Sequence, residues 1–211
     1  MNTANGRREQ KRQSRRRIVD AAARLMRRDG MAPTAVAEVM AAAGLTHGGF
    51  YGHFPNKEAL TRTAFRAAMA QTRRRWLRGL EGLRGRQLLR WLAGRYLTPE
   101  HLEARADGCP LPALAAEIGR GDDELRDDFS SETRSLVAAI AEGIAIPGAG
   151  PEQADDRAMA FLALCVGAMT LARASGDQDQ ADRILRACRA AAPELADGIA
   201  GKTRQQDGDV M

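Results

Sequence analysis

The stretch that decides the fold is Ala43-Gly-Leu-Thr-His-Gly-Gly-Phe-Tyr-Gly-His-Phe-Pro-Asn-Lys-Glu-Ala-Leu60. Its centre predicts a short helix over residues 46–54, because Thr46 is a common helix N-cap and Pro55 cannot continue the helix. Phe50 and Phe54 stand four residues apart and therefore share one face of that helix. We expect this aromatic face to be buried and the opposite, polar face to be available to phosphates and base edges.

A second helix is predicted immediately before this one, over residues 34–43. Apolar residues recur there with the 3.6-residue period of a helix, Thr34 can cap its N-terminus, and Gly44 ends it. Two helices that meet across a turn as short as Gly44-Leu45 are typical of the helix-turn-helix. In that motif the second helix enters the major groove of B-DNA.

A longer helix is predicted to precede this pair, over residues 11–29. Its apolar stripe includes Ile18 and Met26, and Gly30 ends it. The sequence therefore predicts four segments, which are a disordered basic arm over 1–10, a helix-turn-helix domain over 11–60, a larger domain over 61–200 and a flexible tail over 201–211.

Positive charge is concentrated in the same third of the chain. Residues 1–62 hold twelve of the 32 Lys and Arg residues but only five of the 27 acidic residues, so their net charge is +7, whereas the remaining residues carry −2. This split indicates a polyanionic partner, usually nucleic acid, although a solvated basic tail would give the same split. Arg15 and Arg16, in the densest basic run, are candidate phosphate or minor-groove contacts.

The stretch 43–60 closely resembles the signature of the tetracycline-repressor (TetR) family, which reads roughly A-G-V-S-x-G-x-L/F-Y-x-H-F-x-S/N-K-E-x-L. The resemblance is close over 18 residues and extends in outline to about 50. It implies an all-α fold, with a three-helix DNA-binding domain and a larger helical ligand-binding and dimerisation domain. It also implies a transcriptional repressor that binds an inverted-repeat operator in double-stranded DNA and is released by a small-molecule inducer.

The resemblance also assigns DNA contacts to individual residues. Lys57 falls where the family holds a phosphate, and Thr34 resembles another backbone contact. The residues that fall where the family contacts DNA are Thr46, His47, Gly48, Gly49, Tyr51 and His53. Three glycines, Gly48, Gly49 and Gly52, lie in this segment, and each costs a helix about 0.5–1 kcal/mol of stability relative to Ala. We therefore expect a marginal helix that reads DNA mainly through His47 and Tyr51. For Tyr51 and His53, packing or capping is the alternative role.

The rest of the sequence predicts a larger helical domain. Residues 98–112 are expected to form a loop, and residues 147–151 form another. Helices are expected over residues 57–77, around 88–96, and over 111–119, 122–143, 152–175 and 178–191.

One of these helices contains the uncharged stretch 158–172, which is apolar around most of its circumference and therefore needs cover on all sides. The resemblance implies a homodimer through the last two long helices, about residues 152–191. The stretch is too short for a membrane span, and no signal peptide is recognisable at the N-terminus. We therefore expect a cytoplasmic protein without a membrane partner.

Cys109 stands at the start of a predicted helix, where the N-terminus favours a thiolate and can lower the pKa of the thiol. Residues 107–117 resemble the G-C-x…A-x-x-x-E segment of a TetR branch that includes electrophile- and oxidant-sensing repressors. In that branch the matching cysteine is the reactive one. The resemblance therefore makes Cys109 a candidate sensor, whose modification by an electrophile would release DNA, while a small buried core residue is the alternative.

A conventional ligand pocket is the other route to control. Trp91, Tyr96 and Phe129 are candidates to line a mostly apolar cavity between helices, the usual setting of a small-molecule site. The same residues would also serve an ordinary core, so both interpretations stay open.

An enzyme is the main competing class. The sequence has no G-x-S-x-G, Walker A or H-E-x-x-H motif and no Cys/His cluster, and His101 is expected to be a solvated loop residue. We therefore expect no catalytic residue, no metal site and no cofactor. A sequence-blind architectural or RNA-binding protein would explain the charge split but not the 18-residue signature.

Overall fold

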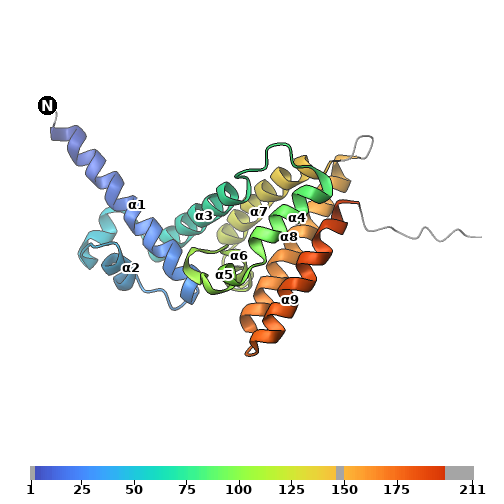
Figure 1. The fold of residues 1–211 in the computed structure, drawn as a ribbon. Helices are drawn as coiled ribbons and strands as arrows, with labels where there is room; N and C mark the ends of the chain where they lie inside the picture. Colours follow the sequence, from blue (N-terminus) through green and yellow to red (C-terminus); the bar gives the residue numbers. More distant parts are fainter. Residues whose placement is uncertain (1–2, 146–149, 198–211) are drawn as a thin grey trace, which may run out of the picture.

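The computed structural model describes residues 3–145 and 150–197, and these residues form helices and connecting turns without any strand (Figure 1). The all-α prediction is confirmed. In chain order the elements are α1 (Thr3–Asp29), α2 (Val36–Ala42), the 3-10 helix η1 (His47–Gly52), α3 (Lys57–Trp76), α4 (Gly85–Tyr96), α5 (Pro99–Glu103), η2 (Arg105–Asp107), α6 (Leu111–Ile118), α7 (Asp123–Ile144), α8 (Pro151–Ala174), α9 (Gln178–Ala191) and η3 (Ala192–Ala196).

The helices form a small N-terminal unit and a larger bundle (Figure 1). The small unit consists of α1, α2 and η1, and its core includes Ile18, Met40, Phe50 and Phe54, each at most 2% exposed. In the bundle, α8 packs against both α7 and α9. The long helix α3 joins the two parts, because it packs against α1 at one side and α7 at the other. The boundary expected at residue 60 therefore falls inside one continuous helix.

The first helix is longer than the sequence predicts. It begins at Thr3 rather than near residue 11, so the disordered arm expected over 1–10 is wrong for residues 3–10. These residues include good helix formers, and Glu9 pairs with Arg12 at 2.6 Å and accepts a hydrogen bond from Gln13 at 3.1 Å. A helix nucleated by the buried residues of its second half can extend through such a segment at little cost.

The helix-turn-helix differs in two local details. The helix α2 starts at Val36, because the buried hydroxyl of Thr34 donates to the carbonyl of Gly30 at 2.7 Å instead of capping the helix. The segment after the turn is a 3-10 helix rather than an α-helix. A glycine-rich segment favours short, poorly bonded helical turns, which agrees with the marginal stability expected for it.

The loop expected over residues 98–112 is largely helical. Thr98 caps α5 by accepting from the backbone N–H of His101 at 3.2 Å, and Pro99 occupies the first helical position, where its missing N–H costs nothing. The short helix η2 follows directly. The connection between α3 and α4 contains Gly79 and Gly82, and both of these and Gly85 at the start of α4 have positive φ.

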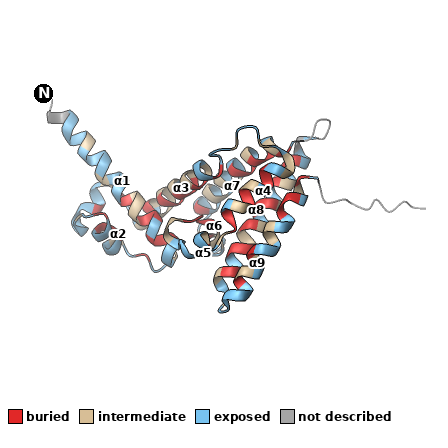
Figure 2. Ribbon diagram, in the orientation of Figure 1, coloured by how far each residue is buried: buried red, intermediate tan, exposed pale blue. Residues whose placement is uncertain are grey.

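The helix α8 is the most apolar of the long helices in the bundle. By length and composition alone its residues 152–174 could cross a membrane, but a single helix of this kind is weak evidence for a span, and 39% of its most apolar window is buried in the fold (Figure 2). Met159 and Leu171 on this helix remain 48% and 62% exposed. Most of the loop expected over 147–151 and the tail expected over 201–211 lie outside the described residues.

Candidate DNA-binding surface and ligand pocket

Residues 46–54, hereafter the reading segment, present their polar side chains to solvent. Phe50 and Phe54 are 1% and 2% exposed, and their rings stack with centroids 6.0 Å apart against the core of the small unit. On the other face Thr46, His47 and both following glycines are exposed. Tyr51 is 72% exposed, and only the edge of its ring rests on Phe50. The segment thus has one anchored face and one face without protein cover.

The glycines of the reading segment are not required by the fold. None of Gly48, Gly49 and Gly52 has positive φ. A Cβ added at Gly48 or Gly52 would meet no atom within 4 Å, and one added at Gly49 would make ordinary contact with Met40 at 3.6 Å. Gly44, in the turn, differs, because its φ of +67° favours glycine. The reading segment is therefore bare on its solvent side, with no internal packing that explains why.

Arg15 anchors the reading segment rather than standing free. Its guanidinium lies 4.0 Å from the centroid of the Phe54 ring and donates to the backbone carbonyl of His53. Arg16 is different, because its side chain is 85% exposed and reaches only Asp20, at 3.7 Å. Of the two arginines expected to contact DNA, Arg16 is the one whose charge is available to a phosphate in this conformation.

His53 is partly buried between the reading segment and α1. Burial lowers the pKa of His53, and the neighbouring charges of Lys11 and Arg15 lower it further. Its Nδ1 is buried and has no hydrogen-bond partner among the described residues. His53 is therefore a neutral group in a cationic surrounding, which favours an approaching phosphate.

Thr34 and Lys57 lie at the other edge of the surface. The side chain of Thr34 is buried and bonded to Gly30, so it is not available to a phosphate in this conformation. Lys57 begins α3 after the Asn56 cap, whose side chain accepts from Ala59 N at 2.8 Å. The ammonium of Lys57 donates to the carbonyl of Ala32 at 3.2 Å, which holds it beside the turn between α1 and α2.

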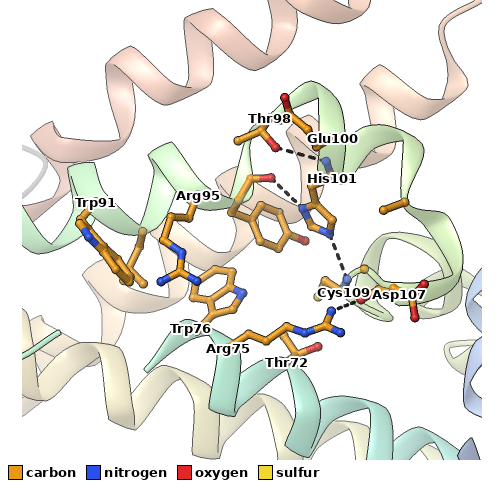
Figure 3. Close-up of a pocket in the computed structure, with 14 residues that line it drawn as sticks. Thr72, Arg75, Trp76, Trp91, Arg95, Thr98, Glu100, His101, Asp107 and Cys109 are labelled. Carbon is orange, nitrogen blue, oxygen red and sulfur yellow. Dashed lines mark hydrogen bonds between the residues drawn. The ribbon is translucent and has the colours of Figure 1, made fainter. Parts of the chain in front are cut away.

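A cavity of about 320 Å³ opens among α3, α4, α5 and the segment that follows (Figure 3). Trp91, Tyr96 and Cys109, expected to lie at a ligand or sensor site, all line it. Phe129 does not line it, because its ring stacks on Phe65 at 6.2 Å. The other lining residues are Thr72, Arg75, Trp76, Leu92, Arg95, Thr98, Glu100, His101, Ala104, Asp107 and Gly108.

The thiol of Cys109 is 3% exposed and lies at the inner wall of this cavity. Burial raises the pKa of the Cys109 thiol, and nearby donors, first the hydroxyl of Tyr96, only partly oppose this. The lowered pKa expected from a helix N-terminus is therefore wrong. The desolvation of the buried thiol outweighs these donors, which include the backbone N–H of Leu111 at the start of α6.

His101 holds the backbone around Cys109. Its Nε2 accepts from the Cys109 backbone N–H at 3.0 Å, and its Nδ1 lies 2.7 Å from the carbonyl of Tyr96 (Figure 3). Because Nε2 must be an acceptor, the proton of the neutral ring sits on Nδ1 and donates to Tyr96. Burial lowers the pKa of His101 and stabilises this neutral form. The interpretation of His101 as a solvated loop residue is wrong.

The pocket and the small N-terminal unit are directly bonded. Asp107 pairs with Arg24 of α1, and the backbone carbonyl of Gly108 accepts from buried Arg27 at 3.4 Å. On α6, the carboxylate of Glu117 accepts from the backbone N–H of Met31 and of Ala32, each at 3.0 Å. Both ends of the segment from residue 107 to 117 are therefore bonded to the helix-turn-helix unit.

Family models match both halves of the chain. Residues 18–64 match the bacterial regulatory proteins of the tetR family, and residues 91–193 match the C-terminal domain of LmrA/YxaF-like transcriptional regulators. The chain is a TetR-family transcriptional regulator. Regulators of this family are typically DNA-binding repressors that form dimers, bind ligands in the C-terminal domain and generally have no enzymatic activity. Membership in the branch with the cysteine motif stays a prediction.

Solved structures of TetR-family regulators share this fold. A regulator from Cytophaga hutchinsonii aligns with a TM-score of 0.70 and 22% identity, over 90% of this chain and 96% of its own. One from Chloroflexus aurantiacus J-10-FL aligns with a TM-score of 0.68 and 29% identity, over 90% and 95%. The reduced form of NemR from E. coli aligns with a TM-score of 0.70 and 18% identity, over 86% and 96%. Among curated proteins, none matches the sequence significantly.

Two residues of this TetR-family regulator were missed as site residues by the sequence reasoning. His101 was expected to be a loop residue. Glu117 entered only as the last residue of the stretch 107–117, and no role was predicted for it. Their roles depend on partners eight and 86 residues away, at Cys109 and Met31. One local signal could have corrected the prediction for His101. Thr98 followed by Pro99 is typical of a helix start, which would have placed His101 in a helix rather than in a loop.

Proposed function

We propose that this TetR-family regulator represses transcription from an inverted-repeat operator, which it binds as a homodimer in the cytoplasm, and that a small molecule in the pocket releases it. The observation that carries the proposal is the double attachment of the segment 107–117. One end lines the pocket, and both ends bond to the helix-turn-helix unit. A ligand that shifts this segment must also shift the reading segment relative to the bundle.

The DNA side of the proposal rests on the exposed face of the reading segment. Tyr51 and His47 are exposed on it, and the exposed guanidinium of Arg16 on α1 is held only by a 3.7 Å contact with Asp20. In a two-fold dimer the two reading segments would enter major grooves about 34–36 Å apart, one helical turn of DNA. Phosphate contacts from the basic half of α1 would make the affinity fall steeply with salt.

The dimer side rests on α8 and α9. The exposed apolar side chains Met159 and Leu171 lie on α8, the most apolar of the long helices. Burying such side chains against a second copy stabilises a dimer by about 25 cal/mol per Å² of apolar area. The homodimer through residues 152–191 therefore remains our proposal for this face.

The coupling follows three consecutive contacts. A ligand that displaces Cys109 from its bond to His101 would move the start of α6, which begins two residues later. The far end of α6 carries Glu117, bonded to Met31 and Ala32. Ala32 in turn accepts from Lys57, the expected phosphate contact. A shift of α6 would thus reach the DNA-binding surface through hydrogen bonds rather than through loose packing.

Modification of Cys109 is the second route to the same movement. An electrophile that enters the pocket would reach the Sγ at its inner wall, although the raised pKa of the thiol slows such an attack. Cys109→Ala separates the two routes. If the variant still leaves DNA in response to an electrophile as the unaltered protein does, the thiol route is excluded and the pocket route stands.

The experiment that tests the function is a binding assay with DNA from upstream of the regulator's own gene. We expect a mobility shift and a footprint with two-fold symmetry, whose affinity falls steeply as salt rises. Arg16→Ala should reduce this salt slope, whereas Arg90→Ala, an exposed residue on α4 away from the reading segment, should not. Equal binding to unrelated duplexes would overturn the proposal in favour of a sequence-blind DNA-binding protein.

A further inference from the structure

The pocket has an aromatic wall that suits a flat molecule. Trp76 meets Tyr96 edge to face at 5.0 Å and Phe161 at 5.9 Å, and Tyr96 meets the ring of His101 at 4.4 Å. Trp91 lines the cavity from α4 (Figure 3). Rings packed in this way offer faces and edges to another ring. A cavity of about 320 Å³ is near the lower end for ligand pockets and fits a molecule of one or two rings.

Two guanidinium groups line the same cavity without an acidic partner. Arg95 lies over the Trp91 ring at 4.4 Å and donates to the backbone carbonyl of Arg78 at 3.2 Å. Arg75 donates to the backbone carbonyl of Asp107. Among the described residues neither has a carboxylate oxygen within 4.0 Å. Since a guanidinium has five N–H donors and is always charged, each retains donors for an anion.

The acidic groups of the pocket are already engaged. Asp107 pairs with Arg24. Glu100 belongs to the first turn of α5, where its own backbone amide and then Thr98 lower the pKa of its carboxyl, and Figure 3 draws it at the far side from Arg95. The charged side chains that line the pocket or hydrogen-bond to a lining residue are the arginines Arg24, Arg27, Arg75, Arg95 and Arg173 and the acids Glu100 and Asp107.

This excess of cations favours a ligand with negative charge. Burial lowers the pKa of Arg27, and the neighbouring charge of Arg75 lowers it further, so the protein places cations here against their mutual repulsion. A cationic ligand would add to that repulsion, although it could stack on the tryptophans. A neutral ligand with a carbonyl oxygen could accept from Arg75 or Arg95 but would leave their positive charge uncompensated. An anion both accepts from the free guanidinium donors and compensates this charge, and charge-assisted hydrogen bonds are the stronger ones.

We infer that the ligand of this pocket is a small, flat aromatic carboxylate, whose ring packs against the tryptophans and whose carboxylate binds Arg95 and Arg75. The inference rests on the proposed function, since it names the ligand class of the site proposed to release DNA. Arg95 is the better anchor of the two, because removing it leaves the bonds of Asp107 to α1 and α3 intact.

Three probes with the same rings and different charge test the inference, namely 1-naphthoate, 1-naphthamide and 1-naphthylmethylammonium. Calorimetric titration of the full chain at pH 7.5 should give the tightest binding for naphthoate and the weakest for the ammonium. Arg95→Met should weaken naphthoate binding by about tenfold, the size of one charged hydrogen-bond interaction, and weaken naphthamide binding less, since the amide oxygen carries no charge. Arg95→Lys keeps the charge and should retain part of the preference.

The control is Arg90→Met, an exposed arginine on the same helix that does not line the pocket, and it should leave all three affinities unchanged. Equal or tighter binding of the amide or the ammonium, or no binding of any probe at millimolar concentration, would overturn the inference. Operator binding by the same preparations separates this failure from that of the proposed function. A chain that recognises its operator but ignores naphthoate loses only the ligand class.

Discussion

The reading segment, residues 46–54, and the pocket wall, residues 98–110, are short stretches of similar length with opposite internal bonding. The reading segment carries three glycines, and apart from its two buried phenylalanines and the partly buried His53 its side chains are exposed. The pocket wall is tied to α1, α3 and α8 by hydrogen bonds from Arg24, Arg75 and Arg173. The reading segment keeps its hydrogen-bonding groups for a partner, whereas those of the pocket wall are bonded inside the protein, so a ligand that moves the pocket wall must displace existing bonds.

The largest effect is expected at Tyr51. Tyr51→Ala removes the most exposed large side chain of the reading segment, so we expect specific operator binding to weaken by about 1–3 kcal/mol per half-site, the range of one good base contact. In a dimer the two half-sites combine. Fluorescence anisotropy with operator and with scrambled duplex measures the change.

Tyr51→Phe is the matched control, because it keeps the ring and removes only the hydroxyl. Thermal stability should be the same in both variants, since the side chain is largely solvated. Unchanged operator affinity in Tyr51→Ala would mean that the reading segment faces DNA with another surface.

The next effect concerns the bond between the two regions. Glu117→Gln removes the charge that two backbone N–H groups share, and hydrogen bonds to a charged group stabilise a fold by about 1.5–3 kcal/mol. We expect a loss of this order in urea denaturation. Glu142→Gln, an exposed glutamate on α7, should lose almost nothing.

The same variant sharpens the comparison of the two regions. If Glu117 transmits the state of the pocket wall, a pocket ligand should still bind Glu117→Gln but should release operator less completely. A variant that is destabilised yet released as fully as the unaltered protein would show that the coupling runs through other contacts, such as Asp107 with Arg24.

What the sequence could predict differs between the two regions for a physical reason. The helix-turn-helix depends on local signals, namely an apolar period, the Gly44 turn and the Asn56 cap, and each of these is visible within a few residues. The pocket depends on pairings such as Glu117 with Met31, which no local pattern encodes. Phe129 had the right chemistry for a lining residue but packs on Phe65 instead.

The same distinction explains the two errors about charge and order. The pKa of the Cys109 thiol is set by its burial rather than by its position at a helix start, and burial depends on the whole fold. The N-terminal segment is helical because residues that could be disordered alone continue a helix whose second half is buried against α3. Local composition sets what a segment can do, and the tertiary contacts select among the possibilities.

A smaller effect of opposite sign is expected at the glycines. Gly48→Ala and Gly52→Ala should each raise stability by about 0.5–1 kcal/mol, because an added Cβ meets open space and reduces the entropy of the unfolded chain. Gly44→Ala should instead lower stability, by about 1–2 kcal/mol, because φ there is +67°. Differential scanning calorimetry measures all three.

The operator affinity of these glycine variants shows whether the bare surface serves DNA binding. If the bare surface serves close approach to DNA, Gly48→Ala should bind operator more weakly although it is more stable. A variant that gains stability and binds operator equally well would show that the open space beside Gly48 is not filled by DNA.

The smallest effect is a pH dependence centred on His101 in the pocket wall. Burial lowers its pKa below the ordinary value near 6.5, opposed by its bond to the Tyr96 carbonyl and reinforced by Arg173 and Arg75. The unfolded chain therefore takes up a proton before the folded one does. Its contribution to stability is complete above about pH 6.5 and is lost as the pH falls below that value.

The variant His101→Asn isolates this contribution, because His53, whose pKa burial also lowers, changes stability in the same direction. Urea denaturation between pH 7.5 and 5.5 should show a smaller loss in the variant than in the unaltered protein. An identical loss in both would assign the pH dependence to the reading segment instead. Protonation of Nε2 would also break its bond to the Cys109 N–H, so the pocket wall, with its internal bonds, is the region that acid should loosen first.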